Sequence, residues 1–423
     1  MKILAAFAFL TLALSVSAQT MPEGADRAVW ERALKLHKKS IVIDGHNDIT
    51  SPMVDEDYDL MTPTLGRYHQ SGSPFHTDMS RLKASGITGE FFSIYVSASY
   101  ARDGGSMRRA MEMIDVVNRA VEKYPNDLTS CTTAAQIRRA KKDGKICALM
   151  GIEGGHAIEN SLYALRNFYR LGIRYMTLTH NNTNDWADAC CDEKRHNGLT
   201  DFGKEVIREM NRLGMLVDIS HVSDKTMHDV LDLTKAPVIF SHSATRMGIN
   251  HPRGVPDDVL KRLPQNGGVV MVVFYPTFLD QEYWDATRAR SERLKPQLDA
   301  LREQYKDDRQ GFLAAERKLL AENPIPITSY TKIVDHMDHI KRVAGIDHIG
   351  LGSDYDGVPL LPAPMQGAED MVLVTYEMLR RGYTEAEVRK VLGENVLRAM
   401  EQAEKVAGSR KVSGDGSLMK ISK

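Results

Sequence analysis

The chain of 423 residues has little of several features that mark specialised classes of protein. It carries only four cysteines and no Cys-x2-Cys zinc knuckle, and neither charge is in excess, since 55 basic residues face 56 acidic ones. The balanced charge argues against a nucleic-acid partner or a polybasic membrane contact. Hydrophobic residues make up 42% and charged residues 26%, as in ordinary globular proteins, and the length suits an α/β barrel with insertions.

The four cysteines are Cys131, Cys147, Cys190 and Cys191. Four cysteines admit three pairings, and the sequence does not select one. Cys190 and Cys191 are adjacent, so a disulfide between them would be strained. The sequence therefore assigns the cysteines no chemistry.

The two ends of the chain differ in composition from the rest. Lys2 precedes an apolar run over residues 3–14, and a triplet of small residues ends at Ala18. This pattern predicts a signal peptide that is cut after Ala18, and hence a secreted or periplasmic protein. An uncleaved anchor helix is disfavoured because a membrane span needs about 20 apolar residues. Residues 408–423 are polar and Gly/Ser-rich, which predicts a disordered tail without a GPI signal and leaves residues 19–407 as one domain.

Eight apolar runs with the composition of strands alternate with amphipathic, helix-like stretches. Several runs have apolar centres that do not alternate, as expected for parallel strands covered on both faces. The pattern predicts a (β/α)8 TIM-like barrel, with a doubly wound open sheet as the alternative. Polar residues at the C-terminal end of almost every run favour the barrel, because barrel enzymes collect their active sites there. The runs are Ser40–Asp48, Ile87–Ala98, Ile146–Gly155, Ile173–Asn181, Met215–Ser223, Ala236–Ser243, Gly267–Tyr275 and His348–Gly357.

Helices are predicted between these runs, and Asp201 and Asp224 stand where N-cap or first-turn residues are expected. The segment Asp280–Asn323 is charged and helix-rich, which predicts a helical insertion with a solvated face after the seventh strand. Because it hangs from the catalytic end of the barrel, a lid and an oligomer contact are both open. The predicted helices are Gly104–Lys123, Leu162–Leu171, Asp201–Leu213, Asp224–Leu231 and Asp257–Leu263.

Five metal-binding side chains fall at the C-terminal ends of four predicted strands: His46, Asp48, Glu153, His221 and His242. Each alone is a weak signal, since a strand-end Glu is as often a cap and a single His is more often structural. A barrel, however, brings the ends of its strands to one mouth, and imidazole and carboxylate suit zinc. Five ligands are too many for one tetrahedral ion that also holds water. Two zinc ions, about 3.5–4 Å apart and sharing a carboxylate and an activated water, are the economical interpretation.

Two further polar residues follow strands of the predicted barrel. Asp354 ends the eighth run, and it could be a sixth ligand or a proton carrier beside the bridging water. His180 ends the fourth run, where it could stabilise the oxyanion of a tetrahedral intermediate or be a hydrogen-bonded core histidine.

With these residues in view, the sequence resembles the membrane (renal) dipeptidase family of zinc metallopeptidases, within the metal-dependent amidohydrolases. The matching segments run from about residue 40 to residue 400. They are IDGHND, GIEGGHAI, RYMTLTHNNTNDWAD, NGLTDFG, LVDISHVSD, PVIFSHS, RGVPDDVL, NGGVVMVVFY, DHMDHIKRVAG, GLGSDYDGV and GENVLRAM.

The resemblance implies a role for each candidate residue. His46 and Asp48 would hold the first zinc and His221 and His242 the second, with Glu153 bridging both. Four other residues would meet the substrate: Asp354 as the proton carrier between bridging water and leaving amine, His180 near the scissile carbonyl, Arg253 on the dipeptide's free carboxylate, and Tyr275 as a further contact. A homodimer is also implied. The chain departs from the animal members in lacking a GPI signal and in the longer insertion at 280–323, which leaves substrate size and dimer geometry open.

Two groups of histidines are not expected to bind metal. His336 and His339 are three residues apart on a predicted helix and are interpreted as part of a solvated face. His156 follows Glu153 closely, and a structural or supporting role is favoured.

Two rival functions remain. Another amidohydrolase, acting on lactams, N-acyl amino acids or phosphoesters, would keep the same metal site. A secreted peptide-binding protein with a retained metal mouth is disfavoured, because a binder has no need of the proton carrier Asp354.

Overall fold

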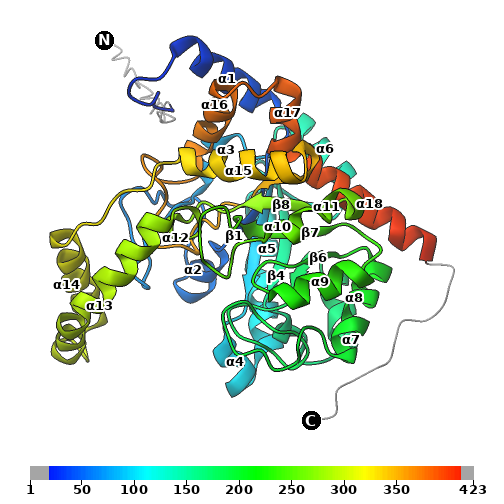
Figure 1. Cartoon of the computed structure of the whole chain (residues 1–423), viewed down its shortest axis with the longest axis horizontal. Coiled ribbons are helices and arrows are strands. Elements are labelled where there is room, and N and C mark those ends of the chain that lie inside the picture. Colours follow the sequence, from blue (N-terminus) through cyan, green and yellow to red (C-terminus); the bar gives the residue numbers. More distant parts are fainter. Residues whose placement is uncertain (1–18, 411–423) are drawn as a thin grey trace, which may run out of the picture.

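The computed structural model describes residues 19–410, and its central element is a parallel sheet of nine strands (Figure 1). The sheet closes on itself, because β2 pairs with both β1 and β4 while β9 pairs with β1 and β8. The strands are β1 Ile43–Asn47, β2 Gly89–Tyr95, β3 Leu128–Ser130, β4 Ile146–Glu153, β5 Ile173–Thr177, β6 Leu216–Asp218, β7 Val238–Ser243, β8 Val269–Val272 and β9 Ile349–Leu351.

Eight of these strands form the barrel, and each lies within one of the eight predicted runs, so the predicted (β/α)8 barrel is confirmed. The ninth, β3, pairs only with the outer edge of β4 and was not predicted. It has three residues, of which only Leu128 is buried, so it leaves no apolar run in the sequence.

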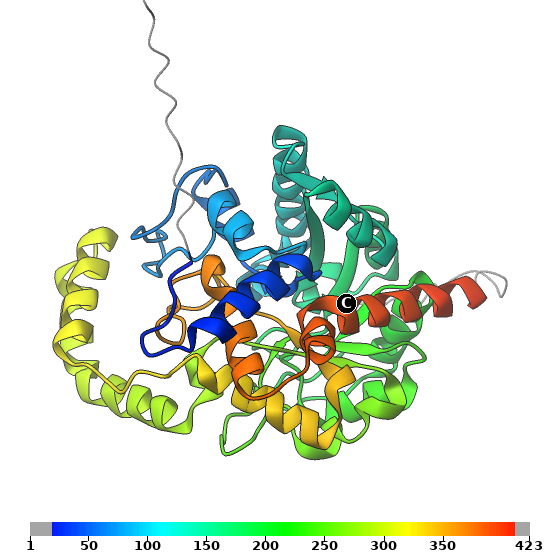
Figure 2. The same ribbon diagram turned by 90° about the horizontal axis from the view of Figure 1, so that it is seen from above.

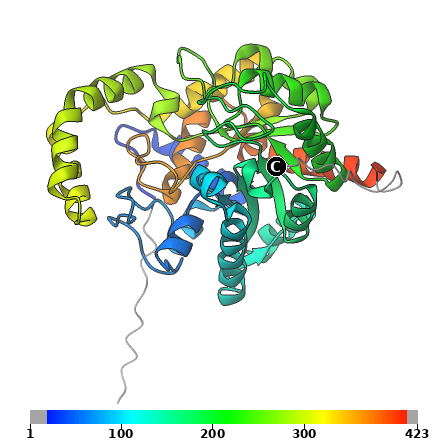
Figure 3. The ribbon, with the colours of Figure 1, turned by 90° about the horizontal axis from the view of Figure 1, so that it is seen from below.

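Helices surround the barrel, as the views from above and below show (Figures 2 and 3). They are α1 Arg27–Lys39, α2 Thr50–Asp55, α3 Met79–Ser85, α4 Ala98–Asp103, α5 Ser106–Lys123, α6 Ala134–Asp143, α7 Leu162–Arg170, α8 Asp201–Leu213, α9 Asp224–Leu233, α10 Asp257–Leu260, α11 Leu263–Asn266, α12 Pro276–Leu279, α13 Gln281–Gln304, α14 Arg309–Glu322, α15 Thr331–Val343, α16 Val372–Arg380, α17 Glu385–Arg389 and α18 Asn395–Arg410.

Local signals fix where the helices begin and end. The side chain of Thr200 accepts from the backbone N–H of Gly203 at the start of α8, and Ser223 caps α9 in the same way. Asp201 and Asp224 are therefore first-turn residues, where a carboxylate favours the positive end of the helix dipole. The predicted helix Asp257–Leu263 is wrong in one respect, because it is divided into α10 and α11.

The core inside the barrel also supports the mouth. A buried cluster joins side chains from seven barrel strands with α6 and α18. Tyr175 is the largest of them, and its hydroxyl reaches from this apolar layer to the polar groups above it. The cluster comprises residues such as Ile43, Phe91, Leu149, Tyr175, Leu216, Ile239 and Met271.

The insertion after β8 forms an arm made of α13 and α14, which extends away from the barrel (Figures 1 and 2). The second helix returns to the body, where the Arg309 Nε–H donates to the carbonyl of Gln70 at 3.1 Å and the Arg317 guanidinium lies 4.6 Å from the ring centre of Tyr68. The arm therefore contacts the body through α14 in addition to its connection with α12.

The structure differs from the sequence-based predictions at α15 and at the C-terminal end of α18. His336 and His339 do not lie on a solvated face, because both are buried; His336 bonds the Thr245 hydroxyl at 2.8 Å and the Leu279 carbonyl at 3.1 Å. The tail predicted from residue 408 is also wrong at its start, since α18 continues to Arg410. The predicted signal peptide, residues 1–18, and the tail beyond 410 lie outside the described residues.

A disulfide joins Cys131 and Cys147, a pairing that the sequence left open. Cys190 and Cys191 are free thiols. Among residues 19–410, no helix combines the length and the apolar character that crossing a membrane requires.

Candidate active site

The side chains predicted to bind metal meet around the carboxylate of Glu153, the last residue of β4. Its Oε2 lies 3.4 Å from His46 Nε2, which is in turn 3.3 Å from Asp48 Oδ2. Its Oε1 lies 3.1 Å from His221 Nε2 and 3.4 Å from His242 Nε2. The two oxygens of one carboxylate thus face two separate pairs of ligands.

The hydrogen bonds behind the three histidines determine which ring nitrogen is free. Tyr175 donates its hydroxyl proton to the Gly45 carbonyl, so its oxygen accepts from His46 Nδ1 at 2.8 Å. Ser241 donates to a carboxylate oxygen of Asp218 at 2.6 Å, so its oxygen accepts from His242 Nδ1. Each ring then presents an unprotonated Nε2 to the centre.

His221 is oriented in the same way, because its Nδ1 lies 3.0 Å from the side-chain oxygen of Asn181. Its Nε2 is 2.9 Å from that of His242, yet neither nitrogen has a proton to share. Burial lowers the pKa of His242 to about 3, and burial with the charge of Arg253 lowers that of His221 well below its usual range. Two lone pairs and a carboxylate oxygen that face one another at this distance call for a cation between them.

Asp354 lies beside this cluster, in the turn after β9. Its carboxylate groups with His46 and His242 within ligand distance, and the side chain is buried. Burial, together with the negative charges of Asp48 and Glu153, raises the pKa of Asp354 well above its usual range. A carboxyl group of this kind can hold a proton near neutral pH and release it to a neighbour.

His180 also borders the cluster. Its Nε2 is 4.0 Å from Glu153 Oε1, and its ring lies 4.6 Å from that of His221 and 5.0 Å from that of Tyr95. Burial lowers the pKa of His180, so its ring is neutral and can donate one hydrogen bond.

Arg253 reaches the mouth from the loop after β7. Its two terminal nitrogens donate to the Ser243 hydroxyl at 3.1 Å and to the His242 carbonyl at 3.0 Å. Its Nε–H is buried and has no acceptor among the described residues. An unpaired donor on a buried guanidinium is the group that a ligand carboxylate would satisfy.

A cavity of about 390 Å³ opens over these groups, a size that suits a small ligand. It brings together eight of the nine predicted site residues, while His46 lies fully buried beneath it. The lining residues are Asp48, Ser51, Tyr95, Glu153, His180, Asn181, His221, His242, Arg253, Tyr275, Phe278, Asp354, Asp356, Gly357, Val358 and Pro359.

The backbone is strained at three positions around this cavity. His221, Asp354 and Asp356 adopt φ angles of 67°, 63° and 62°, which side-chain-bearing residues seldom take. The carbonyl of His221 is fixed by the Cys190 N–H at 2.6 Å and by the Thr179 hydroxyl at 3.2 Å. Such strain persists only where surrounding contacts hold it, and it accompanies functional geometry.

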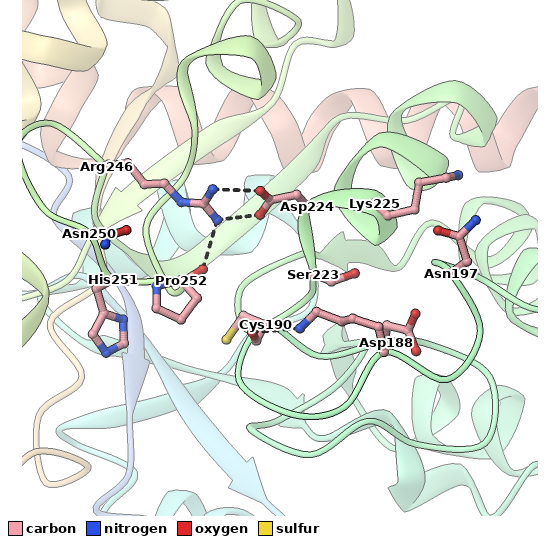
Figure 4. A pocket seen from close by; sticks show the side chains of 11 residues that line it. Asp188, Cys190, Asn197, Ser223, Asp224, Lys225, Arg246, Asn250, His251 and Pro252 are labelled. Carbon is pink, nitrogen blue, oxygen red and sulfur yellow. Dashed lines mark hydrogen bonds and ion pairs between the residues drawn. The ribbon is translucent and has the colours of Figure 1, made fainter.

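A second cavity, of about 350 Å³, is lined in part by Arg246, Asn250, His251 and Pro252, which precede Arg253 in the same loop (Figure 4). There Arg246 reaches Asp224, the first residue of α9, through both terminal nitrogens, and it also donates to the Pro252 carbonyl at 3.2 Å. This ion pair connects the loop to the start of α9.

The residues that hold the histidines in place were not predicted from the sequence. The sequence around Tyr175, Asp218 and Ser241 does not distinguish them from other strand residues. Only their hydrogen bonds in the folded protein identify them. Asn181 directly follows His180, so its position at a strand end could have indicated it. Phe278 and Tyr95 line the cavity with rings that a sequence assigns to the core.

Comparison with known proteins adds a family to this geometry. The model of the membrane dipeptidases, peptidase family M19, matches residues 30–414. The solved structure of the probable dipeptidase PvdM from Pseudomonas aeruginosa is 23% identical with a TM-score of 0.73, covering 90% of this chain and 100% of that one.

A metallopeptidase from Rhodobacter sphaeroides, solved with a phosphinate mimic of the dipeptide L-Ala-D-Ala, is also 23% identical. Its TM-score is 0.67, and the match covers 86% of this chain and 99% of that one. At this identity the two structures establish a shared fold.

Proposed function

This chain belongs to the membrane dipeptidase family of metallopeptidases, which are hydrolases, and from that premise we propose that it hydrolyses dipeptides with two zinc ions. The observation that carries the proposal is the orientation of Glu153, whose two oxygens face different ligand pairs. A single ion would need only one of them.

The donor set fits zinc. His46 and Asp48 would hold one ion, His221 and His242 would hold the other, and Glu153 would bridge them. Neutral imidazole nitrogens and carboxylate oxygens are the ligands that zinc takes in hydrolases. When bound, the pair of ions supplies a water of lowered pKa and polarises the scissile carbonyl.

The substrate is selected by Arg253. Its unpaired Nε–H can donate a hydrogen bond to one oxygen of a ligand carboxylate. A planar guanidinium matches the geometry of a carboxylate better than an ammonium group does. Because Arg253 borders the same cavity as Glu153, the carboxylate must lie close to the bond that is cleaved. A dipeptide meets this requirement, and Tyr275 lines the same wall as a further contact.

Two groups of the chain take part in the chemistry. Asp354 accepts the proton of the attacking water and passes it to the leaving amine, as a buried carboxyl of raised pKa can do. Neutral His180 donates a hydrogen bond to the carbonyl oxygen as negative charge develops there.

Secretion after cleavage at Ala18 and assembly as a homodimer complete the proposal. The first is supported by the sequence of residues 1–18 and the second by the family resemblance. Size-exclusion chromatography with light scattering and N-terminal sequencing of exported protein test them.

The decisive experiment pairs metal analysis with a substrate panel. We expect two zinc ions per chain and turnover of dipeptides in preference to lactams, N-acyl amino acids and phosphoesters, and we expect chelation to abolish turnover. Full activity after complete metal removal would overturn the proposal. Faster turnover of N-acyl amino acids would retain the metal site and change the substrate.

A further inference from the structure

The cavity above Glu153 has an aromatic wall formed by Tyr275 and Phe278. Most of the other lining residues are polar or acidic, and Val358 and Pro359 add aliphatic groups. Tyr275 and Phe278 meet edge to face, with ring centres 5.0 Å apart. An apolar surface inside a polar cavity gives a ligand a defined orientation.

Phe278 is also next to the carboxylate anchor. The guanidinium of Arg253 lies 5.3 Å from the centre of its ring. When the substrate's C-terminal carboxylate binds Arg253, the α-carbon of that substrate residue lies one bond from the carboxylate carbon, and its side chain begins two bonds away. The side chain of the substrate's C-terminal residue is therefore within reach of Phe278.

The arm holds this wall in place. The ring of His251 lies between Phe278, at 4.7 Å, and Trp284 of α13, at 4.8 Å. His251 Nδ1 accepts from the backbone N–H of Arg253 at 3.1 Å, so the same ring touches the anchor and the wall. A continuous series of contacts thus runs from the first turns of α13 to the cavity.

Two other contacts keep the loop from shifting. The side-chain oxygen of Gln281 accepts from the backbone N–H of Asn250 at 2.8 Å, on the side of the arm. Earlier in the loop, Arg246 pairs with Asp224 at the start of α9 (Figure 4). Because these contacts hold the loop in place, a substitution of Trp284 should affect the cavity through the packing of His251 against Phe278.

We propose that Phe278 forms the subsite for the side chain of the substrate's C-terminal residue, that this subsite takes aliphatic and aromatic side chains, and that Trp284 is a positioning residue for it. This inference rests on the proposed dipeptidase function. It gives the arm a role in selecting substrates, beyond the choice between a lid and an oligomer contact.

The test compares glycyl-leucine with glycyl-glycine, which differ only in the C-terminal side chain. We expect the protein to prefer glycyl-leucine, and Phe278→Ala to lower kcat/KM for it about 10-fold, chiefly through KM, with at most about a twofold change for glycyl-glycine. Phe278→Leu should restore most of the preference. Trp284→Ala should give a weaker loss of the same kind, and Trp284→Phe should restore it.

Arg317→Ala is the matched control, because Arg317 belongs to the arm but touches exposed Tyr68 instead of His251. It should leave both substrates unaffected. An equal loss for both dipeptides in Phe278→Ala, or no preference in the unmodified protein, would overturn the subsite.

Calorimetric binding of the same two dipeptides to zinc-loaded Asp354→Asn protein separates the subsite from the chemistry. Tighter binding of glycyl-leucine that disappears in the double variant with Phe278→Ala supports the subsite even if the protein hydrolyses neither dipeptide, in which case the proposed function alone fails. Equal binding of the two dipeptides contradicts the subsite.

Discussion

At the barrel mouth, histidines and carboxylates are buried beside one another, whereas on the arm only Tyr283, Leu294 and Leu313 are buried over two helices. The mouth groups lack enough donors to satisfy themselves, and a supporting layer of hydrogen bonds fixes them. The arm is held by exposed ion pairs, such as Lys295 with Asp299 at 2.6 Å, and by contacts at its two ends.

The difference separates two ways of building function. Buried acceptors that face one another are energetically costly without a cation between them. Substitution of a residue at the mouth should therefore have a large effect on metal binding and activity. Exposed ion pairs contribute little each, so the arm tolerates change except where Trp284 meets His251. The loss of activity caused by substitutions should therefore differ by orders of magnitude between the mouth and the arm.

Glu153→Gln should have the largest effect. It keeps the shape of the side chain and removes the charge that two ligand pairs share. We expect at least one zinc ion to be lost and kcat to fall by more than about 10⁴-fold. Metal content by mass spectrometry and kinetics on one preparation check this. Normal activity with two retained ions would contradict the bridging role.

Asp354→Asn should come next, because it removes a proton carrier while leaving the cradle in place. We expect two bound ions and a kcat lower by about 10²–10⁴-fold. Retention of metal is the control that distinguishes a lost proton carrier from a lost ligand. A variant that loses an ion instead would make Asp354 a ligand.

Acid should destabilise the body of the protein. Burial lowers the pKa of His37, His76 and His336 to about 4 each, so the unfolded chain binds protons more readily between pH 6.5 and about 4. The free energy of unfolding should therefore fall as pH decreases through this window, by at most about 3 kcal/mol per histidine. Urea unfolding at several pH values measures it. A stability that is flat over this range would be inconsistent with three neutral buried rings.

Arg253→Lys should weaken substrate binding and leave the metals in place. The charge remains, but the planar fork and the unpaired Nε–H are lost. We expect kcat/KM for dipeptides to fall about 10- to 150-fold, mostly through KM. Dipeptide amides, which lack the carboxylate, provide the control, since the variant and the unmodified protein should treat them alike.

Arg317→Ala, on the arm, should have the smallest effect. It removes a stacking contact with exposed Tyr68, which is worth less than about 1 kcal/mol. Thermal unfolding should shift slightly and kcat/KM should not change. A loss of activity as large as that of Arg253→Lys would show that the two regions are more closely coupled than their contacts indicate.

The contrast also explains what the sequence could predict. His46, Glu153 and His242 were found because parallel strands deliver their ends to one place, so position along the chain implies position in space. Tyr175 and Ser241 were missed because their contacts with His46 and His242 depend on the folded arrangement of the strands. His336 was assigned to solvent because a charged helix sequence does not reveal that α15 turns this ring toward Thr245 and Leu279.

The arm shows the same limit. Its helices were predicted from composition, but the contact of Trp284 with His251 depends on how the first turn of α13 leaves α12. The pattern of charges along a helix does not reveal which residues outside the arm the helix will contact. The return of α14 to Tyr68 and Gln70 was likewise invisible in the sequence.

Anomalous diffraction from a crystal of the zinc-loaded protein, recorded on both sides of the zinc absorption edge, tests directly whether Glu153 joins two metal sites. We expect two peaks, one beside each carboxylate oxygen of Glu153, with His46 and Asp48 around one peak and His221 and His242 around the other. A single peak, or a pair of peaks that Glu153 does not touch, would contradict it.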